Sequence, residues 1–507
     1  MAEDLSACHD LVTDECASSF LASNRFLWMI AALTVVFFSL TNLPWQLDDF
    51  SQERQALASF DMVKEGRWLY QQAPRDREAT KPPEIPWISA GIYGATGSWD
   101  VAWRLPSFAA ALALAALIFQ AARRRFGRLA AAVALSAFAL NMLSPRLATL
   151  VRTDMPLALV VFVIGLQIWR KIEAQERWNR RDRWLLFLLL TIGVFIKGPI
   201  IYVFLLPAIG LFQWRWRKMP AAQAWSGSWP WLASLGIFTI WVAGGIVTQP
   251  GFFDQVIMHE FLGRFSSSEQ RPHPPYYYMG HLLHKFAPWS ELLLILTALH
   301  WRRARESLRS VVTRMGPDLF WLGCWSLSGL IIMSLVPSKR LDRIFPVLPP
   351  FCLLLAGQLA AAGRVPALRR QAHGWTVVAL AAALVLSGQY VATKVVSGYR
   401  GHRDALVKFG HEVRDEAVLK HWRYEVVTSH DGGMLLYLNK THFVEPDQAT
   451  AEWNRGEIDA LVMREGDANS LREKLPGGLV VCSSISQQRG SEHRNRYVLV
   501  ARMRGEN

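Results

Sequence analysis

Charged residues are scarce in this 507-residue chain: Asp, Glu, Lys and Arg make up 19% of it, whereas hydrophobic residues make up 51%. Soluble domains usually carry about 25% charged residues. Cysteine is scarce as well. The five cysteines are scattered, with no Cys-x-x-Cys pair and no His cluster at the spacing of a metal site. The composition therefore argues against an ordinary soluble protein, a disulfide framework and a local zinc motif.

Three further features are missing. No cleavable signal peptide is evident, because the first 25 residues contain several acids and the apolar segment after them is too long for a signal core. The region after residue 395 has no glycine-rich phosphate loop, so a nucleotide-binding role is not expected. No internal repeat relates two halves of the chain, as it does in many transporters.

The sequence contains many long apolar segments with few charged residues. A transmembrane helix needs about 20 residues to cross a hydrocarbon core of about 30 Å. Several segments are shorter, so we expect them to belong to a packed bundle. Residues 85–98 are apolar but short, and we interpret them as a helix lying in the membrane interface. The count is eleven spans, with thirteen as the upper alternative. The eleven segments are 26–44, 105–122, 129–143, 155–169, 184–196, 199–213, 229–247, 286–300, 318–336, 344–362 and 374–392.

The net charge of +14 is concentrated in alternate loops. Lys and Arg favour the cytoplasmic side of a membrane protein. These loops therefore predict a cytoplasmic N-terminal tail and an outer position for the loops 45–104 and 248–285 and for the C-terminal region. The basic residues form no patch on a soluble domain, so nucleic-acid binding is not expected. The basic loops are 123–128, 170–183, 215–218, 302–314 and 364–370.

Three regions follow from this pattern: a cytoplasmic tail at 1–25, a transmembrane domain at 26–392 and a soluble α/β domain at 395–507. The last region is large enough to bury a core of its own, and its apolar strands alternate with helices. The expected strands are 424–428, 434–437, 458–463, 479–482 and 497–501, and the expected helices are 404–420 and 447–455. The sequence thus predicts an α-helical polytopic membrane protein with a C-terminal α/β domain.

Two acids, Asp48 and Asp49, lie where the first span ends and an amphipathic helix is expected at 50–65. One interpretation is a catalytic base. A carboxylate at the membrane–water boundary is partly desolvated, which raises its basicity, so it could take a proton from an acceptor hydroxyl. The other interpretation is that Asp49 only caps the helix, with Gln52 completing a capping box.

A third acid, Asp154, lies in the outer connection before the fourth span, in the string Arg152-Thr-Asp154-Met-Pro156. A helix N-cap is the alternative to an active-site role, because Pro156 marks the start of a helix.

Six cations are expected on the outer side, where they could hold the phosphate of a lipid. Taken singly, each could instead snorkel to the lipid headgroups. As a set they are costly at the membrane boundary without an anionic partner. They are Lys81, Lys197, Arg264, Lys339, Arg340 and Arg343. The candidates for binding sugar or acceptor are Arg152, Glu260, Tyr276 and Tyr277, although anchoring in the interface explains the tyrosines equally well.

In order and spacing, these motifs between residues 40 and 350 resemble the GT-C glycosyltransferases, in particular the aminoarabinose transferase (ArnT-like) and protein O-mannosyltransferase group. The resemblance implies a GT-C fold and an inverting transfer of a sugar from a polyprenyl phosphate, at the outer face of a bacterial inner membrane, to a lipid, glycan or protein. Lipid A modification is one such reaction. It also implies that Asp48 is the catalytic residue, and that Arg152 and Asp154 face the active-site cavity.

The sequence departs from this family in places. Thr80 and Phe261 stand where some members have zinc ligands, so no cofactor is expected with certainty and a divalent metal is left open. The run Lys-Arg-Leu-Asp-Arg at 339–343 replaces the commoner Lys-x-x-x-Tyr, which weakens the case for lipid A as acceptor. Two alternatives remain: a transporter or flippase of lipid-linked sugars, and a non-catalytic assembly protein that docks through its C-terminal domain.

Overall fold

The computed structural model divides into two compact units. Unit 1 combines Met1–Thr41 with Leu105–Val391, and unit 2 combines Asn42–Arg104 with Ala392–Asn507. The division falls within two long helices, α5 and α17. The structure describes residues 20–42, 45–47, 50–73, 77–216, 224–264, 273–304, 315–429, 431–489, 492–494 and 496–502.

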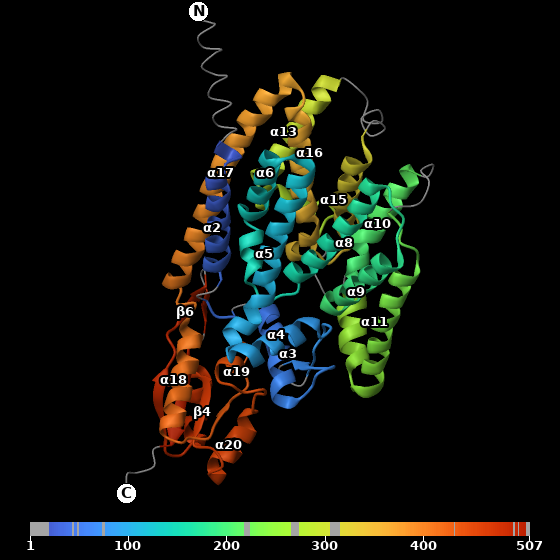
Figure 1. The fold of residues 1–507 in the computed structure, drawn as a ribbon. Coiled ribbons are helices and arrows are strands. Elements are labelled where there is room, and N and C mark those ends of the chain that lie inside the picture. The colour runs from blue at the N-terminus through green and yellow to red at the C-terminus, as the bar shows by residue number, and fades with distance from the viewer. Residues whose placement is uncertain are drawn as a thin grey trace, which may run out of the picture. The chain divides into compact units, whose positions relative to one another are not determined.

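Unit 1 is a bundle of helices that lie side by side (Figure 1). Each of the eleven apolar segments overlaps a helix, as their hydrophobicity predicts for a chain in a membrane. The helices are α2 (Asn24–Leu40), α5 (Trp99–Phe126), α6 (Arg128–Ala139), α7 (Ser144–Ala148), α8 (Asp154–Ala174), α9 (Arg180–Lys197), α10 (Ile200–Arg215), α11 (Trp229–Thr248), α12 (Tyr277–Lys285), α13 (Trp289–Ala304), α15 (Pro317–Leu335), α16 (Leu348–Gly363) and α17 (Pro366–Arg400). Three shorter turns are η1 (Phe253–Phe261), η2 (Leu262–Arg264) and η3 (Leu341–Val347).

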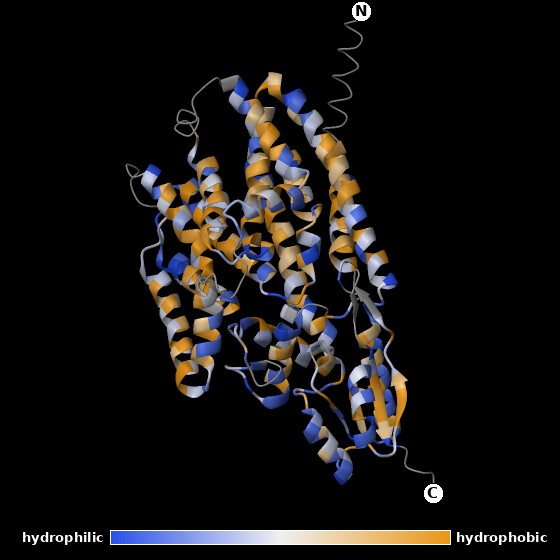
Figure 2. Cartoon of the chain, turned by 180° about the vertical axis from the view of Figure 1, so that it is seen from behind, coloured by the Kyte–Doolittle hydropathy of each residue, from blue (hydrophilic) through white to orange (hydrophobic). Residues whose placement is uncertain are grey.

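Within the described part of the chain, six helical segments are long and apolar enough to cross a membrane. A seventh is added if α12 and α13, which meet at a bend of 102°, count as one span. Three shorter apolar helices are α2, α6 and α10. Hydrophobic residues predominate along the bundle helices (Figure 2). The number of eleven spans stays a prediction.

Glycines allow three helices of the bundle to approach closely, as small residues do in membrane proteins. A Cβ atom on Gly165 of α8 would lie 2.0 Å from the ring of Trp325 on α15. A Cβ atom on Gly329 of α15 would lie 2.5 Å from the ring of Phe204 on α10. Neither glycine can be replaced without moving an aromatic ring. This packing fixes α8, whose first residue is one of the predicted site residues.

Unit 2 begins with two helices, α3 (Phe50–Glu65) and α4 (Glu84–Thr96). The bounds of α3 are those that its amphipathic pattern predicts, and the chain leaves it at Gly66 with a φ of 74°, which glycine adopts without strain. Between the two helices lies a small antiparallel ribbon of β1 (Gln72–Ala73) and β2 (Arg77–Glu78).

The C-terminal part of unit 2 contains a four-stranded sheet in the order β3-β4-β8-β5. Strands β3 and β4 are parallel, and β8 is antiparallel to both β4 and β5. Four of the five expected strands coincide with these strands. Their bounds are β3 (Tyr424–Val426), β4 (Ala460–Arg464), β5 (Gly478–Ser483) and β8 (Tyr497–Arg502). A separate two-stranded ribbon pairs β6 (Gln487–Arg489) with β7 (Glu492–Arg494). The helices are α18 (Ala405–Leu419), α19 (Gly433–Tyr437), α20 (Pro446–Arg455) and α21 (Glu465–Leu471), followed by the turn η4 (Arg472–Lys474).

The expected strand at 434–437 is wrong, because these residues form helix α19. Every residue of α19 is buried. A short apolar run that is buried on all sides has no periodicity, so it cannot be assigned to helix or strand from the sequence.

Candidate active site

Asp154 and Lys197 form an ion pair between the ends of two neighbouring helices. Asp154 is the first residue of α8 and Lys197 is the last of α9, so each charge also complements the dipole of its helix. The N-cap residue of α8 is Thr153, and the Asp154 carboxylate accepts from the Lys197 ammonium. Helix α9 ends here because Gly198 takes a φ of 75°, after which Pro199 leads into α10.

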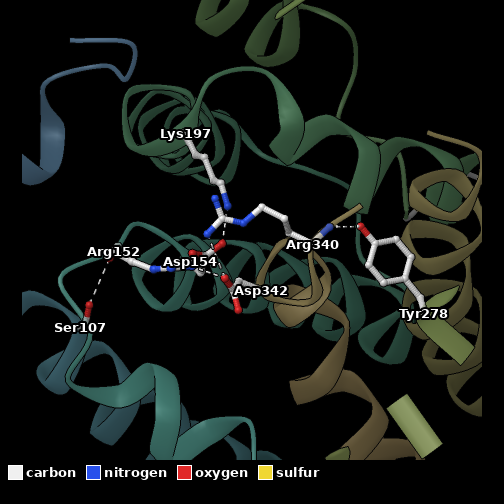
Figure 3. Close-up of polar contacts among 7 residues, drawn as sticks. All are labelled: Ser107, Arg152, Asp154, Lys197, Tyr278, Arg340 and Asp342. Atoms are coloured by element: carbon white, nitrogen blue, oxygen red, sulfur yellow. Dashed lines mark hydrogen bonds and ion pairs between the residues drawn. The ribbon is translucent and has the colours of Figure 1, made fainter. Parts of the chain in front are cut away.

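A second buried carboxylate, that of Asp342 in η3, contacts two arginines (Figure 3). Asp342 pairs with Arg152 from the loop before α8, and Arg340 Nη2 lies 3.5 Å from Asp342 Oδ2. The loop is fixed from α5, where the Ser107 hydroxyl contacts the Arg152 carbonyl at 3.2 Å. In Figure 3 the head groups of Lys197 and Arg340 converge on the two carboxylates.

Lys339 precedes this group in the chain, and its ammonium donates to the carbonyls of His273 and Val336 at 2.8 and 2.7 Å. Burial lowers the pKa of Lys339 below its ordinary value of 10.5. Arg343 is anchored in a similar way, because Nη1 donates to the Ser338 carbonyl at 2.7 Å. Both cations are thus held by backbone carbonyls.

This group of side chains, which we call the cationic cluster, has more positive than negative charges. Among the side chains that the structure describes, five cations against two carboxylates give it a formal charge of +3. The Arg152, Lys197 and Lys339 side chains are largely buried, and buried charge is costly without an opposite charge. An anionic ligand would offset it, and both guanidinium and ammonium groups suit phosphate. The cluster consists of Arg152, Asp154, Lys197, Lys339, Arg340, Asp342 and Arg343.

Tyrosines at the start of α12 lie beside the cationic cluster. Tyr277 stacks on His273 with ring centroids 4.5 Å apart. Tyr278 is buried, and its hydroxyl accepts from the Arg340 amide at 3.3 Å. Tyr276 is 73% exposed. The structure therefore brings Tyr277 close to predicted phosphate ligands, whereas the ring of Tyr276 lies on the surface.

The two acids predicted to act as base, Asp48 and Asp49, lie outside the described residues. The segment just before them is buried in unit 2. The Leu47 amide donates to the Tyr437 hydroxyl at 2.8 Å, and the Gln46 side chain accepts from a backbone amide of α18 at 3.1 Å. The chain that leads to the acids is thus anchored by the C-terminal part of the same unit.

Lys81 also belongs to unit 2, where it lies in the turn before α4. Nearby in the sequence, Asp61 pairs with Arg67 at 2.8 Å and accepts from the Gln72 amide at 3.0 Å. Burial raises the pKa of Asp61 and of Glu78. The Gly-Arg-Trp string at 66–68 therefore has a structural role, which is to close the α3–β1 turn with Arg67.

Two predicted residues are described by their backbone alone: Glu260 in the π-helical turn η1 and Arg264 in the 3₁₀ turn η2. Among the side chains that the structure describes, no three of His, Cys, Asp or Glu come together as a metal-binding set.

Sequence reasoning missed three residues of this region: Ser107, Tyr278 and Asp342. A signal for Asp342 was present, since it is the one acid in the basic run 339–343, and an isolated acid among cations indicates ion pairing. Nothing in the local sequence distinguishes Tyr278 from its two tyrosine neighbours, or marks Ser107 as a contact of Arg152.

The sequence is similar to a known family and to bacterial transferases. Residues 80–244 match the family model described as dolichyl-phosphate-mannose-protein mannosyltransferase. The undecaprenyl phosphate-alpha-4-amino-4-deoxy-L-arabinose arabinosyl transferase of Erwinia tasmaniensis is 26% identical over 355 residues, which cover 68% of this chain and 61% of the relative. Transferase 2 of the same name from Proteus mirabilis is 26% identical over 349 residues, covering 66% and 60%. The chain thus spans about three fifths of the length of these relatives.

The fold is that of solved membrane glycosyltransferases. ArnT from Cupriavidus metallidurans, bound to undecaprenyl phosphate, superimposes with a TM-score of 0.70 at 17% identity, over 95% of this chain and 99% of that one. The apo oligosaccharyltransferase of Archaeoglobus fulgidus gives a TM-score of 0.52 at 11% identity, over 90% and 71%. The chain therefore has the GT-C fold. Its sequence is similar to those of aminoarabinose transferases, which confirms the resemblance read from its motifs.

Proposed function

We propose that this chain is an inverting glycosyltransferase that takes a sugar from a polyprenyl phosphate and transfers it to a lipid, glycan or protein at the outer face of a bacterial inner membrane. The GT-C fold and the similarity to aminoarabinose transferases support this proposal. The relatives are transferases, which favours an enzyme over a transporter or flippase of lipid-linked sugars.

The observation that carries the proposal is the charge of the cationic cluster. Lys197 and Arg340 reach the two carboxylates from two separate parts of the membrane bundle, and Lys339 lies next to Arg340 in the chain. The side chains of the cluster that the structure describes carry a formal charge of +3. The phosphate of the donor supplies negative charge. That charge grows on the leaving oxygen as its bond to the sugar breaks, so these donors bind the transition state more strongly than the ground state.

The reaction that we propose has one displacement. An acceptor oxygen attacks C1 of the sugar, the bond from C1 to the phosphate oxygen breaks, and its electron pair leaves on the phosphate. The acceptor proton passes to Asp48 or Asp49. Asp154 orients the acceptor or the base, and its ion pair holds the Lys197 ammonium in place. The remaining proposed phosphate ligands are Lys81, Arg264 and Arg343, and the proposed sugar or acceptor contacts are Arg152, Glu260, Tyr276 and Tyr277.

Proton transfer and helix capping can be separated by Asp→Asn substitutions, because Asn caps a helix as well as Asp does. The assay is transfer of labelled sugar from a polyprenyl phosphate by the purified full chain, alongside its melting temperature. Asp48→Asn, or Asp49→Asn if that residue is the base, should melt normally and lose transfer by on the order of 100-fold or more. Asp154→Asn should lose less. A fully active Asp48→Asn/Asp49→Asn double variant would rule out a base in this segment.

A further inference from the structure

A groove of about 540 Å³ lies between helices α2, α5 and α6 of unit 1. Its walls are apolar, with Trp28 and Val35 contributed by α2, and Ala116 and Phe119 by α5. Trp28 is 76% exposed. An apolar groove on the outer surface of a membrane bundle is open to lipid chains rather than to water.

One end of the groove is basic. Arg123, in the last turn of α5, and Arg128, the first residue of α6, both line it, and Arg128 donates to the Asn24 side chain at the start of α2. Their neighbour Arg125 instead pairs with Asp318 and Glu173. Across the residues that the structure describes, neither Arg123 nor Arg128 has an acidic partner. Two arginines at the mouth of an apolar groove complement an anionic headgroup.

The N-terminus of α6 adds to this positive end. Its N-cap is Gly127, which has no side chain to satisfy the first amides of the helix. Free amides at a helix N-terminus attract phosphate and other anions. This is a supporting feature, because the groove and its arginines define the site.

The length of the groove matches one membrane leaflet. From Asn24 to Val35, α2 rises about 16 Å at 1.5 Å per residue, which is close to half of a hydrocarbon core of about 30 Å. The basic end belongs to loop 123–128, which the distribution of Lys and Arg assigns to the cytoplasm. A lipid in the groove would therefore come from the cytoplasmic leaflet.

The groove is separate from the cationic cluster. Ser107, which contacts the loop that carries Arg152, is sixteen residues before Arg123 on the same helix. The two positions are thus about 24 Å apart along α5. No residue of the cationic cluster lines the groove.

We propose that this groove binds an anionic phospholipid of the cytoplasmic leaflet, with one acyl chain between α2 and α5 and the phosphate at Arg123 and Arg128. The inference does not rest on the proposed enzymatic function. It assigns a lipid to the opposite end of α5 from the segment that contacts the cationic cluster.

The test is lipid binding to the purified full chain in detergent, measured by native mass spectrometry and by the melting temperature during titration. The probes are dioleoyl phosphatidylglycerol, dioleoyl phosphatidylcholine and undecaprenyl phosphate. Phosphatidylglycerol should bind and stabilise more than phosphatidylcholine. Arg123→Ala/Arg128→Ala should weaken it on the order of 30-fold, from about 1 kcal/mol for each arginine.

Matched variants separate this site from general electrostatics. Arg124→Ala/Arg180→Ala removes the same charge from exposed arginines that do not line the groove, and it should leave binding unchanged. Ala116→Trp fills the groove and should abolish binding, whereas Ala109→Trp, on an exposed position of α5 outside it, should not. Equal binding of the two phospholipids, or equal losses in both arginine pairs, would overturn the proposal. If undecaprenyl phosphate displaces phosphatidylglycerol from this groove, the proposal that the occupant is a phospholipid is refuted.

Discussion

Variants of the ion pair between Lys197 and Asp154 can separate the contribution of Lys197 to stability from its contribution to sugar transfer. Lys197→Met removes the ammonium and leaves the Asp154 carboxylate, which is 5% exposed, without it. Lys197→Met/Asp154→Leu removes both charges and replaces them with apolar side chains. If the pair serves only to join α8 to α9, the double variant should behave like the wild type. If Lys197 also binds the donor phosphate, the double variant should transfer sugar more slowly than the wild type.

The stability of the two variants should differ. Breaking one partner of a buried ion pair costs about 3–5 kcal/mol. We expect the lower end for Lys197→Met, because Arg340 reaches the same group of carboxylates (Figure 3). Replacing both partners of a buried pair with apolar residues is often neutral or stabilising. The melting temperature should therefore fall in the single variant and recover in the double variant.

Transfer should not recover with stability. A charge-assisted hydrogen bond to phosphate contributes about 1.5–3 kcal/mol, which corresponds to about a 10- to 150-fold loss in kcat/KM. Both Lys197→Met and Lys197→Met/Asp154→Leu should show this loss with a polyprenyl-phosphate sugar donor.

The chain contains a matched control on the same two helices. Lys171, in the last turn of α8, pairs with Asp182, in the first turn of α9, at 2.7 Å, and the Lys171 and Lys197 side chains are each 11% exposed. Lys171→Met should lower the melting temperature and leave transfer by the folded protein intact. The reasoning is refuted if the double variant at 197 and 154 regains wild-type transfer, or if Lys171→Met loses transfer to the same extent.

Three further predictions concern other parts of the site. Lys81→Ala should weaken donor use more than Lys81→Arg, measured as the KM and the rate of turnover of the donor; wild-type values in both variants would leave Lys81 a snorkelling residue. Donor binding that depends on the Lys339 ammonium should weaken as the pH rises through the lowered pKa of Lys339. Folding stability should rise with pH between that pKa and 10.5, because in this range the unfolded chain binds more protons than the folded chain. Lys339→Met should remove both effects, as measured by donor titrations and melting curves. Tyr437→Phe leaves the buried Leu47 amide without its acceptor and should cost about 1–3 kcal/mol in unfolding measurements.

The positions of the helices follow from local sequence. In a membrane the backbone polar groups must be hydrogen-bonded within the protein. A helix pairs them within a single segment, so a long apolar run is expected to be helical. Helix α3 could also be predicted from the sequence, because its apolar residues repeat at helical spacing and Gly66 ends the helix. At 434–437 the same reasoning failed, since four apolar residues have no period.

The ion-pair partners of the charged residues could not be predicted from local sequence. Arg152 and Asp342 are 190 positions apart, and Asp154 and Lys197 are 43 apart. Each motif suggested a cation or an acid at the outer boundary. Only the packing of α8 against α9 and η3 determines which of them meet. Nor does the sequence show that the segment before Asp48 is anchored by Tyr437, near the other end of the chain.

The folded arrangement also decides between two interpretations of the cations that the sequence left open. A snorkelling side chain keeps its charged head in water or among lipid headgroups. Arg152 is 4% exposed and Lys339 is 5% exposed, and both heads are directed at protein groups. For these two residues snorkelling is excluded. What remains is a structural network, which would be expected to balance its charges, or a site prepared for an anion. Among the side chains that the structure describes, the cluster has five cations and two acids, and this excess of positive charge favours a phosphate-binding site.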